Sequence, residues 1–119
     1  MKTHKDLDVW KRSVEFVTEI YRTTENFPKD ELYGLTNQIR RAAVSVPSNI
    51  AEGAARKNAK EFIQFLYIAL GSLAELETQI LISKNLKFIN DSSAERFQKE
   101  ITEIRQMISG LIRFLSNKK

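Results

Sequence analysis

The chain of 119 residues has no cysteine and a single histidine, His4, so it lacks the side chains most often used in metal sites and nucleophilic catalysis. Without cysteine, neither a disulfide framework nor a thiolate metal site can form. A ferritin-like di-metal site requires two Glu-x-x-His pairs, which one histidine cannot supply. We therefore expect a protein that is not an enzyme and that holds neither a metal nor another cofactor. The absence of cysteine also agrees with a reducing cytoplasm.

Glycine and long apolar runs are scarce as well. The four glycines are isolated from one another, at Gly34, Gly53, Gly71 and Gly110, so the sequence has no Gly-rich phosphate loop. The longest uncharged stretch, 62–74, is too short to span a bilayer. The N-terminal residues lack the apolar run of a secretory signal. We expect a cytoplasmic protein without a membrane partner.

Positive charge is unevenly distributed along the chain. The 19 lysines and arginines exceed the 15 acidic residues, which gives a formal net charge of +4. The window 40–60 contains five cations and one carboxylate, namely Arg40, Arg41, Arg56, Lys57, Lys60 and Glu52. A basic cluster of this kind favours an anionic partner such as RNA or DNA. The alternative, a solvated face followed by an exposed turn, stays open.

No recognition helix or aromatic stacking platform can be identified in the sequence. Contacts with nucleic acid are therefore expected at backbone phosphates, tolerant of base sequence and sensitive to salt. We expect Arg40, Arg56, Lys57 and Lys60 to make these contacts, with Arg41 as a weaker candidate.

Apolar residues recur at steps of three and four nearly throughout the chain, which predicts amphipathic helices. We place four helices near 7–25, 29–56, 59–84 and 93–117 of a single domain that covers residues 1–119. Short connections favour antiparallel neighbours, so the expected fold is all-α, an antiparallel up-down-up-down four-helix bundle. The expected helix caps are Asp6 for the first helix, Asn58 with Glu61 for the third, and Ser92 with Glu95 for the fourth.

Each helix has an apolar seam that is expected to face the core. In the first helix the seam is Leu7, Trp10, Val14, Val17 and Tyr21, and in the third it is Phe62, Leu66, Ala69, Leu73, Leu76 and Ile80. Several helices carry a second apolar stripe; in the first helix it consists of Val9, Phe16 and Ile20. The second stripes favour a subunit interface, and a thick core is the alternative.

Pro47 lies inside the second predicted helix, where it removes one backbone hydrogen bond and is expected to kink the helix. A hydroxyl group of Ser45 or Ser48 is expected to bond the freed carbonyl of Ala43.

The second and third helices should form an antiparallel hairpin about a turn near Lys57. This register places Ser45 opposite Gly71 and Ser72, where small residues let two backbones approach closely. It also places Arg41 opposite Glu75, and we predict an ion pair between them that fixes the register.

Three blocks of sequence are distinctive: FPKDELYGL at 27–35, QIRRAAVSVPSNIAEG at 38–53 and GSLAELETQ at 71–79. Together they resemble the bacterial four-helix bundle family named for proteins encoded in intervening sequences of 23S rRNA genes. The chain is similar, more distantly, to the accessory protein of diversity-generating retroelements. The blocks contain seven residues that we interpret as structural: Pro47, Asn49, Glu52, Gly53, Gly71, Ser72 and Glu75.

The family resemblance implies a ring-shaped homopentamer with a non-enzymatic role near RNA or DNA. The more distant resemblance suggests nucleic acid and a reverse transcriptase as partners. Our leading hypothesis is an oligomeric helical bundle that binds nucleic acid through a basic surface. The alternative is a protein-interaction scaffold that does not bind nucleic acid directly.

Overall fold

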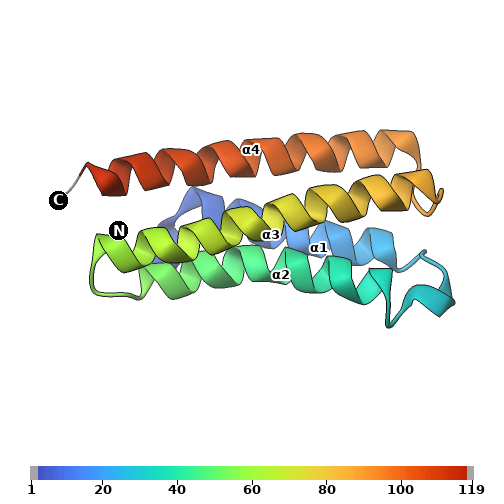
Figure 1. Ribbon diagram of the computed structural model, residues 1–119, viewed down its shortest axis with the longest axis horizontal. Helices are drawn as coiled ribbons and strands as arrows, with labels where there is room; N and C mark the ends of the chain where they lie inside the picture. The colour runs from blue at the N-terminus through green and yellow to red at the C-terminus, as the bar shows by residue number, and fades with distance from the viewer. Residues whose placement is uncertain (1–2, 118–119) are drawn as a thin grey trace.

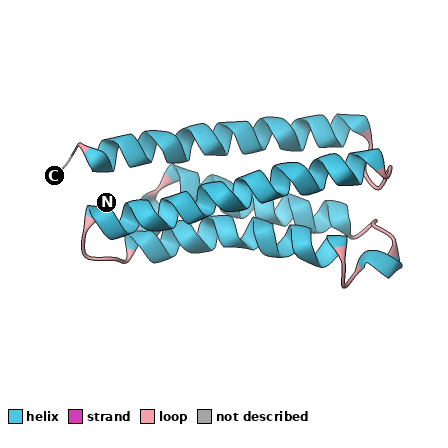
Figure 2. Cartoon of the chain, viewed as in Figure 1, coloured by secondary structure: helices cyan, strands magenta, loops and turns pink. Residues whose placement is uncertain are grey.

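The computed structural model describes residues 3–117, and every regular element in this range is helical (Figures 1 and 2). The elements in chain order are the short 3-10 helix η1 (His4–Asp6), α1 (Asp8–Thr24), the 3-10 helix η2 (Lys29–Glu31), α2 (Leu35–Ala54), α3 (Ala59–Asn85) and α4 (Asp91–Ser116). The prediction of an all-α four-helix fold is confirmed.

The four long helices run up, down, up and down, in a body that measures 47 × 23 × 20 Å. In Figure 1, α3 lies between α2 and α4, and α1 lies behind them. The start of α1, the α2–α3 turn and the end of α4 meet at one end of the bundle, which we call the turn end. The α1–α2 and α3–α4 connections form the far end, where Phe27 packs on Phe88 with ring centroids 5.5 Å apart.

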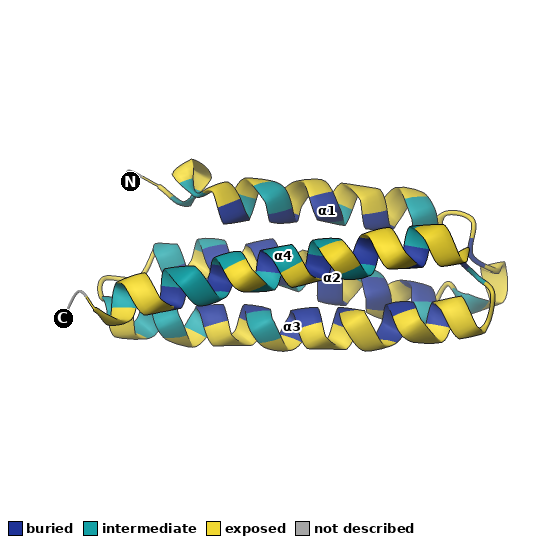
Figure 3. Cartoon of the chain, turned by 90° about the horizontal axis from the view of Figure 1, so that it is seen from above, coloured by how far each residue is buried: buried dark blue, intermediate teal, exposed yellow. Residues whose placement is uncertain are grey.

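The core follows one inward stripe on each helix, and the outward faces are exposed (Figure 3). The predicted seam of the third helix is confirmed, because all six of its residues are buried. In α1 the assignment is wrong in part. The fully buried apolar side chains are those of the second stripe, Val9, Phe16 and Ile20, and Val14 and Tyr21 are exposed. The other seam residues, Leu7, Trp10 and Val17, are half-buried and pack against the core. Both stripes have helical spacing, so periodicity alone cannot show which one faces inward.

The inward stripe of α1 contains two buried residues with hydroxyl groups. Ser13 and Thr24 are buried on this stripe, and each donates a hydrogen bond to the carbonyl four residues earlier, at Val9 (2.7 Å) and Ile20 (2.8 Å). The polar atoms are thereby satisfied within the helix, as buried hydroxyls require.

The predicted start of the second helix is six residues too early. Pro28 opens only the single turn of η2, and α2 begins at Leu35 after Gly34. The Glu31 carboxylate, rather than an N-cap residue, accepts a hydrogen bond from the Leu35 amide at 3.2 Å. The chain therefore makes a corner between 28 and 34 where a continuous helix was expected.

Two of the three predicted caps are also wrong. Asp6 lies in η1, and the N-cap residue of α1 is Leu7, which makes no side-chain cap bond. The cap of α4 is Asn90, whose side chain accepts from the Ser93 amide at 2.7 Å, rather than Ser92. The Asn58 cap is confirmed, with a 2.9 Å bond from the Glu61 amide.

The α2–α3 hairpin has the predicted register. The Ser72 hydroxyl donates to the Ser45 hydroxyl at 2.8 Å, and the Asn49 side chain donates to the same Ser45 oxygen at 2.9 Å. Within the described chain, no bond joins Ser45 or Ser48 to the Ala43 carbonyl, contrary to expectation. The helix α2 is continuous through Pro47, which is buried, and the kink stays a prediction.

The close approach of the two helices occurs at Gly53 and not at Gly71. A Cβ atom at Gly53 would lie 2.8 Å from both Phe62 and Phe65, whereas one at Gly71 would meet nothing within 4 Å. Gly71 is exposed on the outward side of α3. The packing role that we predicted for Gly71 is therefore wrong within the chain.

By length and composition α3 is apolar enough to cross a membrane, with a mean hydropathy of 1.4, and it is the one such helix in residues 3–117. Its buried stripe runs from Phe62 to Ser83 against the other helices of the bundle. This composition is typical of a core helix with apolar residues on more than one face.

Candidate nucleic-acid interface

The five candidate cations do not form one surface. Arg40 lies near the start of α2 and Arg56 lies just after its end, so they are separated by about 24 Å at about 1.5 Å per residue. Arg41 follows Arg40 directly and therefore points about 100° around the helix from it. The charge that is concentrated in the sequence window 40–60 is divided in space among three places.

Arg40 is engaged with the C-terminal turn of α1. Its Nε donates to the Thr24 hydroxyl at 2.9 Å, and Nη2 donates to the Tyr21 carbonyl at 3.3 Å. Its guanidinium carbon also lies 4.6 Å from the centroid of the Tyr21 ring. The Tyr21 carbonyl also accepts from the Glu25 amide at 3.2 Å, so Arg40 adds to an existing bond, and a cation is favourable at the negative C-terminal end of a helix. Arg40 thus joins α2 to α1.

Arg41 and Glu75 are both exposed, and no ion pair joins them within the chain as described. The predicted intrachain pair is therefore wrong, although the Ser45–Ser72 bond confirms the register on which it was based. Both side chains can point into solvent, since an exposed ion pair adds little to the free energy of unfolding.

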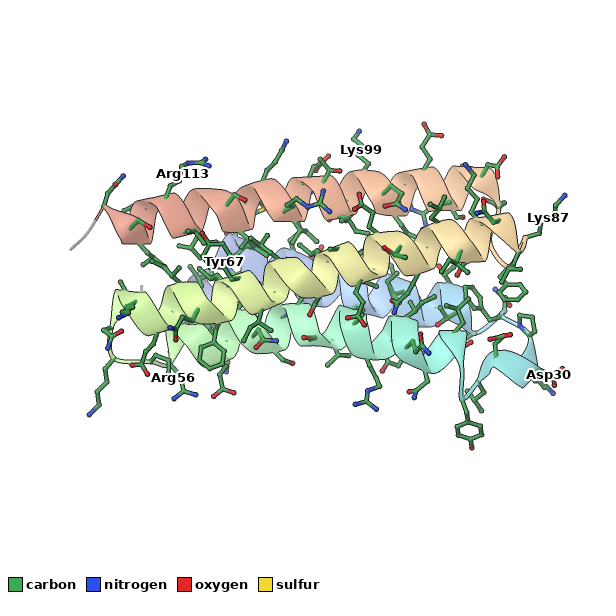
Figure 4. The ribbon with its side chains drawn as sticks, viewed as in Figure 1. Asp30, Arg56, Tyr67, Lys87, Lys99 and Arg113 are labelled. Carbon is green, nitrogen blue, oxygen red and sulfur yellow. The ribbon has the colours of Figure 1, made fainter. Side chains whose placement is uncertain are left out.

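The remaining three cations share the turn end. Arg56, Lys57 and Lys60 are exposed on the α2–α3 turn and the first residues of α3. Arg56 pairs with Glu52 at 3.2 Å, and its guanidinium carbon lies 4.7 Å from the Phe65 ring centroid. Neither lysine has a hydrogen-bond or ion-pair partner in residues 3–117. Figure 4 shows Arg56 at this end, with Lys87 and Asp30 at the opposite one.

A hollow of about 470 Å³ lies beside these cations. Its apolar wall is made by the ends of several helices and includes Leu7, Phe62, Leu111, Phe114 and Leu115. Arg56 and Lys57 belong to the same wall, together with Asn58. The volume falls within the range of about 300–1,000 Å³ that is usual for small-ligand sites.

The sequence pattern did not reveal this hollow, because its walls come from residues far apart in the chain. The one available signal was the up-down-up-down topology, which brings the start of the first helix and the end of the fourth to the turn near Lys57.

Other charged residues form ion pairs across the helices instead. Arg12 of α1 bonds Glu100 at 2.7 and 2.9 Å and also bonds Glu103, both on α4. Hydrogen bonds with Glu100 and then with Glu103 raise the pKa of Arg12 above its usual value, so this guanidinium stays charged. Within the described range, no group of three or more acidic or histidine side chains could hold a metal ion.

These features define an all-α four-helix bundle. The chain belongs to the 23S rRNA-intervening sequence protein family, whose model matches residues 5–110, and the family assignment made from the sequence blocks is confirmed.

One solved structure, from Bacteroides thetaiotaomicron VPI-5482, is described as a protein with unknown function from the S23 ribosomal protein family. It is 26% identical to this chain, with a TM-score of 0.78, over 87% of this chain and 97% of that chain. No curated protein matches the chain. Neither the family description nor that of the solved structure names a catalytic activity.

Proposed function

We propose that this protein is a non-enzymatic, cytoplasmic, oligomeric bundle that binds the backbone of RNA or DNA through its turn end. The interface consists of Arg56, Lys57 and Lys60. Arg40 is left out because α1 occupies its guanidinium, and Arg41 is left out because it lies on another face.

The observation that carries this proposal is the pair of exposed lysines without a partner. Lys57 lies in the α2–α3 turn and Lys60 in the first turn of α3, and both are exposed, so both ammonium groups are available to phosphates. The family description refers to a 23S rRNA intervening sequence, which makes structured RNA the first probe to use.

The test is a binding titration with structured RNA and with duplex DNA over a range of salt concentrations. The variant Lys57→Glu/Lys60→Glu reverses both charges at the turn end. The matched control, Lys84→Glu/Lys87→Glu, makes the same change in net charge with two exposed lysines at the far end. Each lost phosphate contact should reduce the slope of log K against log salt by about 0.7–0.9.

We expect the turn-end variant to lose at least about ten-fold in affinity at low salt, since two contacts are removed and two repulsions added. The far-end variant should lose much less. Equal losses in the two variants would mean that net charge, and not this site, governs binding. Absence of binding by the unmodified protein at low salt would reject the function itself.

Self-association is supported by an outward face of α3 that has no charged residue between Phe62 and Ala74. The exposed side chains on it include Tyr67, which is 59% exposed, and Leu81 further along, which is 52% exposed. Exposed aromatic and aliphatic residues that cluster on one face are typical of protein interfaces. The family resemblance suggests a homopentamer as the product.

The solution mass of the purified protein, measured with and without nuclease treatment, tests this assembly. Tyr67→Asp should lower the mass toward that of one chain. Tyr33→Asp, at a tyrosine that is 92% exposed on the α1–α2 connection, is the matched control and should leave the mass unchanged. A monomeric unmodified protein would contradict the proposal.

The same face of α3 also supports the second candidate function, a scaffold for another protein such as a reverse transcriptase. This function is favoured if a protein partner is recovered after nuclease treatment and the purified chain has no affinity for nucleic acid.

A further inference from the structure

The large apolar side chains that remain exposed are concentrated on one helix. Within the described chain, α3 carries four of them, Tyr67, Ile68, Leu81 and Ile82, each between 42% and 59% exposed. By comparison, α1 carries two, and α2 and α4 carry one each. The outward side of α3 is exposed along the bundle (Figure 3). An apolar face of this kind is typical of a surface that another protein surface covers.

A carboxylate lies in the middle of this face. Ile68, Glu75 and Ile82 follow one another at seven-residue steps, so they form one line along α3. Ser72, three residues before Glu75, bonds Ser45 of α2, so the line runs along the side of α3 that is next to α2. Glu75 is exposed and has no hydrogen-bond or ion-pair partner within residues 3–117.

Arg41 supplies the opposite charge on the neighbouring helix. The hairpin register places Arg41 across from Glu75, and it too is exposed and unpaired within the part of the chain that the structure describes. The face therefore has one free cation and one free carboxylate beside its apolar residues. A second copy of the chain is complementary to this pattern, because it offers a carboxylate to Arg41 and a guanidinium to Glu75. A nucleic acid would suit Arg41 but would be repelled by Glu75.

We propose that the outward face of α3 docks on a second copy of this chain, with Arg41 of one copy paired to Glu75 of the other. The inference rests on the self-association in the proposed function and deepens it by naming the contact. The apolar side chains supply the buried area, and the ion pair fixes how the copies are oriented. Two charges that face each other across the hairpin without pairing in one chain thus find partners between chains.

The experiment measures solution mass over a range of protein concentrations, after nuclease treatment so that nucleic acid cannot bridge copies. The variants are Arg41→Glu, Glu75→Arg, the two changes in one chain, and an equimolar mixture of the two single variants. The matched controls are Lys99→Glu and Glu95→Arg, which make the same changes of charge at exposed positions on α4. Circular dichroism shows whether each variant is folded.

We expect each single variant to associate at least about ten-fold more weakly, because like charges then face each other in the contact. The mixture should regain association, since every contact between unlike copies again joins opposite charges. The variant with both changes should regain it for the same reason. The two control variants should associate as the unmodified protein does.

Recovery in the variant with both changes but not in the mixture would overturn the inference, because it would place the pair within one chain. Single variants that associate normally, or controls that weaken association equally, would also overturn it; Tyr67→Asp would then still show whether α3 is the contact. An unmodified protein that stays a single chain at every concentration would instead reject the self-association in the proposed function, and the face would be left to a different protein.

Discussion

The two ends of α2 carry cations that look alike in the sequence but differ in the structure. At the start of the helix, Arg40 bonds Thr24 and the Tyr21 carbonyl and stacks on the Tyr21 ring, so it holds α1 against α2. After the end of the helix, Lys57 and Lys60 project from an exposed turn without partners in the described chain. The cation at the start of α2 joins two helices, whereas the cations after its end are available to bind a partner.

This difference shows that charge counted over a sequence window does not define a binding surface. What separates the two ends is whether a neighbouring helix terminus lies within reach. Arg40 reaches the negative C-terminal end of α1, where Thr24 and the Tyr21 carbonyl accept from it, whereas no side chain or carbonyl in the described chain accepts from Lys57 or Lys60. Stability and affinity should therefore respond to different substitutions.

The largest expected effect on stability comes from Gly53, which sets the close approach at the turn end. Gly53→Ala forces a Cβ atom to within 2.8 Å of Phe62 and Phe65, and we expect a loss of about 2 kcal/mol from the free energy of unfolding. The matched control is Gly71→Ala, at an open position of α3, which should gain about 0.5–1 kcal/mol from helix propensity. Chemical denaturation measures both. Changes of the same sign would show that the two positions are not distinguished by packing.

Arg40→Ala should lower the free energy of unfolding by about 1–2 kcal/mol, because it removes hydrogen bonds of a charged group and a cation–π contact. It should leave nucleic-acid affinity nearly unchanged. Lys57→Glu/Lys60→Glu should show the reverse, with weaker binding and little change in stability.

Measuring denaturation and binding on both variants tests the comparison directly. A large loss of affinity in Arg40→Ala, with stability retained, would place Arg40 in the interface and remove the distinction between the two ends of α2.

The sequence predicted the number of helices, their order and the hairpin register because these follow from apolar spacing and short connections. It predicted the inward seam of α3, where all six positions are buried, from helical spacing alone, since most residues between them in 62–74 are also apolar. The prediction failed in part on α1, where the exposed Val14 and Tyr21 belong to a stripe as apolar as the buried one. Which stripe faces inward depends on how α2 and α4 pack against it.

The candidate site was predictable only in part. Lys57 and Lys60 were identified because a turn with adjacent cations is recognisable from sequence. The role of Arg40 could not be predicted from the sequence, because it depends on the end of α1 lying beside the start of α2. The hollow could not be predicted either, because Leu7, Phe62 and Phe114 come together in one wall only after the bundle has formed.

A substitution of Asn58 measures how much the N-cap of α3 stabilises the turn end. Its side chain accepts from the Glu61 amide at 2.9 Å and donates to the Glu61 carboxylate at 3.1 Å, so Asn58→Ala should cost about 1 kcal/mol. Ser92→Ala is the control, since Asn90 and not Ser92 caps α4. Hydrogen exchange at the first amides of α3 should quicken in Asn58→Ala alone. A comparable cost for Ser92→Ala would contradict the observed caps.

Arg12 provides the smallest expected effect and extends the comparison to a third arginine. Like Arg40, it joins two helices, but its partners are the carboxylates of Glu100 and Glu103 on α4. The side chains of Arg12 and Glu100 are 35% and 28% exposed, so solvent screens the pair, and Arg12→Met should cost less than about 1 kcal/mol.

The cost of Arg12→Met should decrease as salt increases, since the interaction is between charges near the surface. Raising the pH from 6 to 9 should not change the cost, because a guanidinium is charged throughout this range and the carboxylates raise the pKa of Arg12 further. Denaturation at low and high salt measures this dependence, with Arg105→Met, which loses a single bond to Glu77 at 3.3 Å, as the control. A cost that does not depend on salt would mean that Arg12 contributes through the packing of its methylene groups and not through its charge. In that case the charge of Arg40 would join α1 to α2, whereas the charge of Arg12 would not contribute to joining α1 to α4.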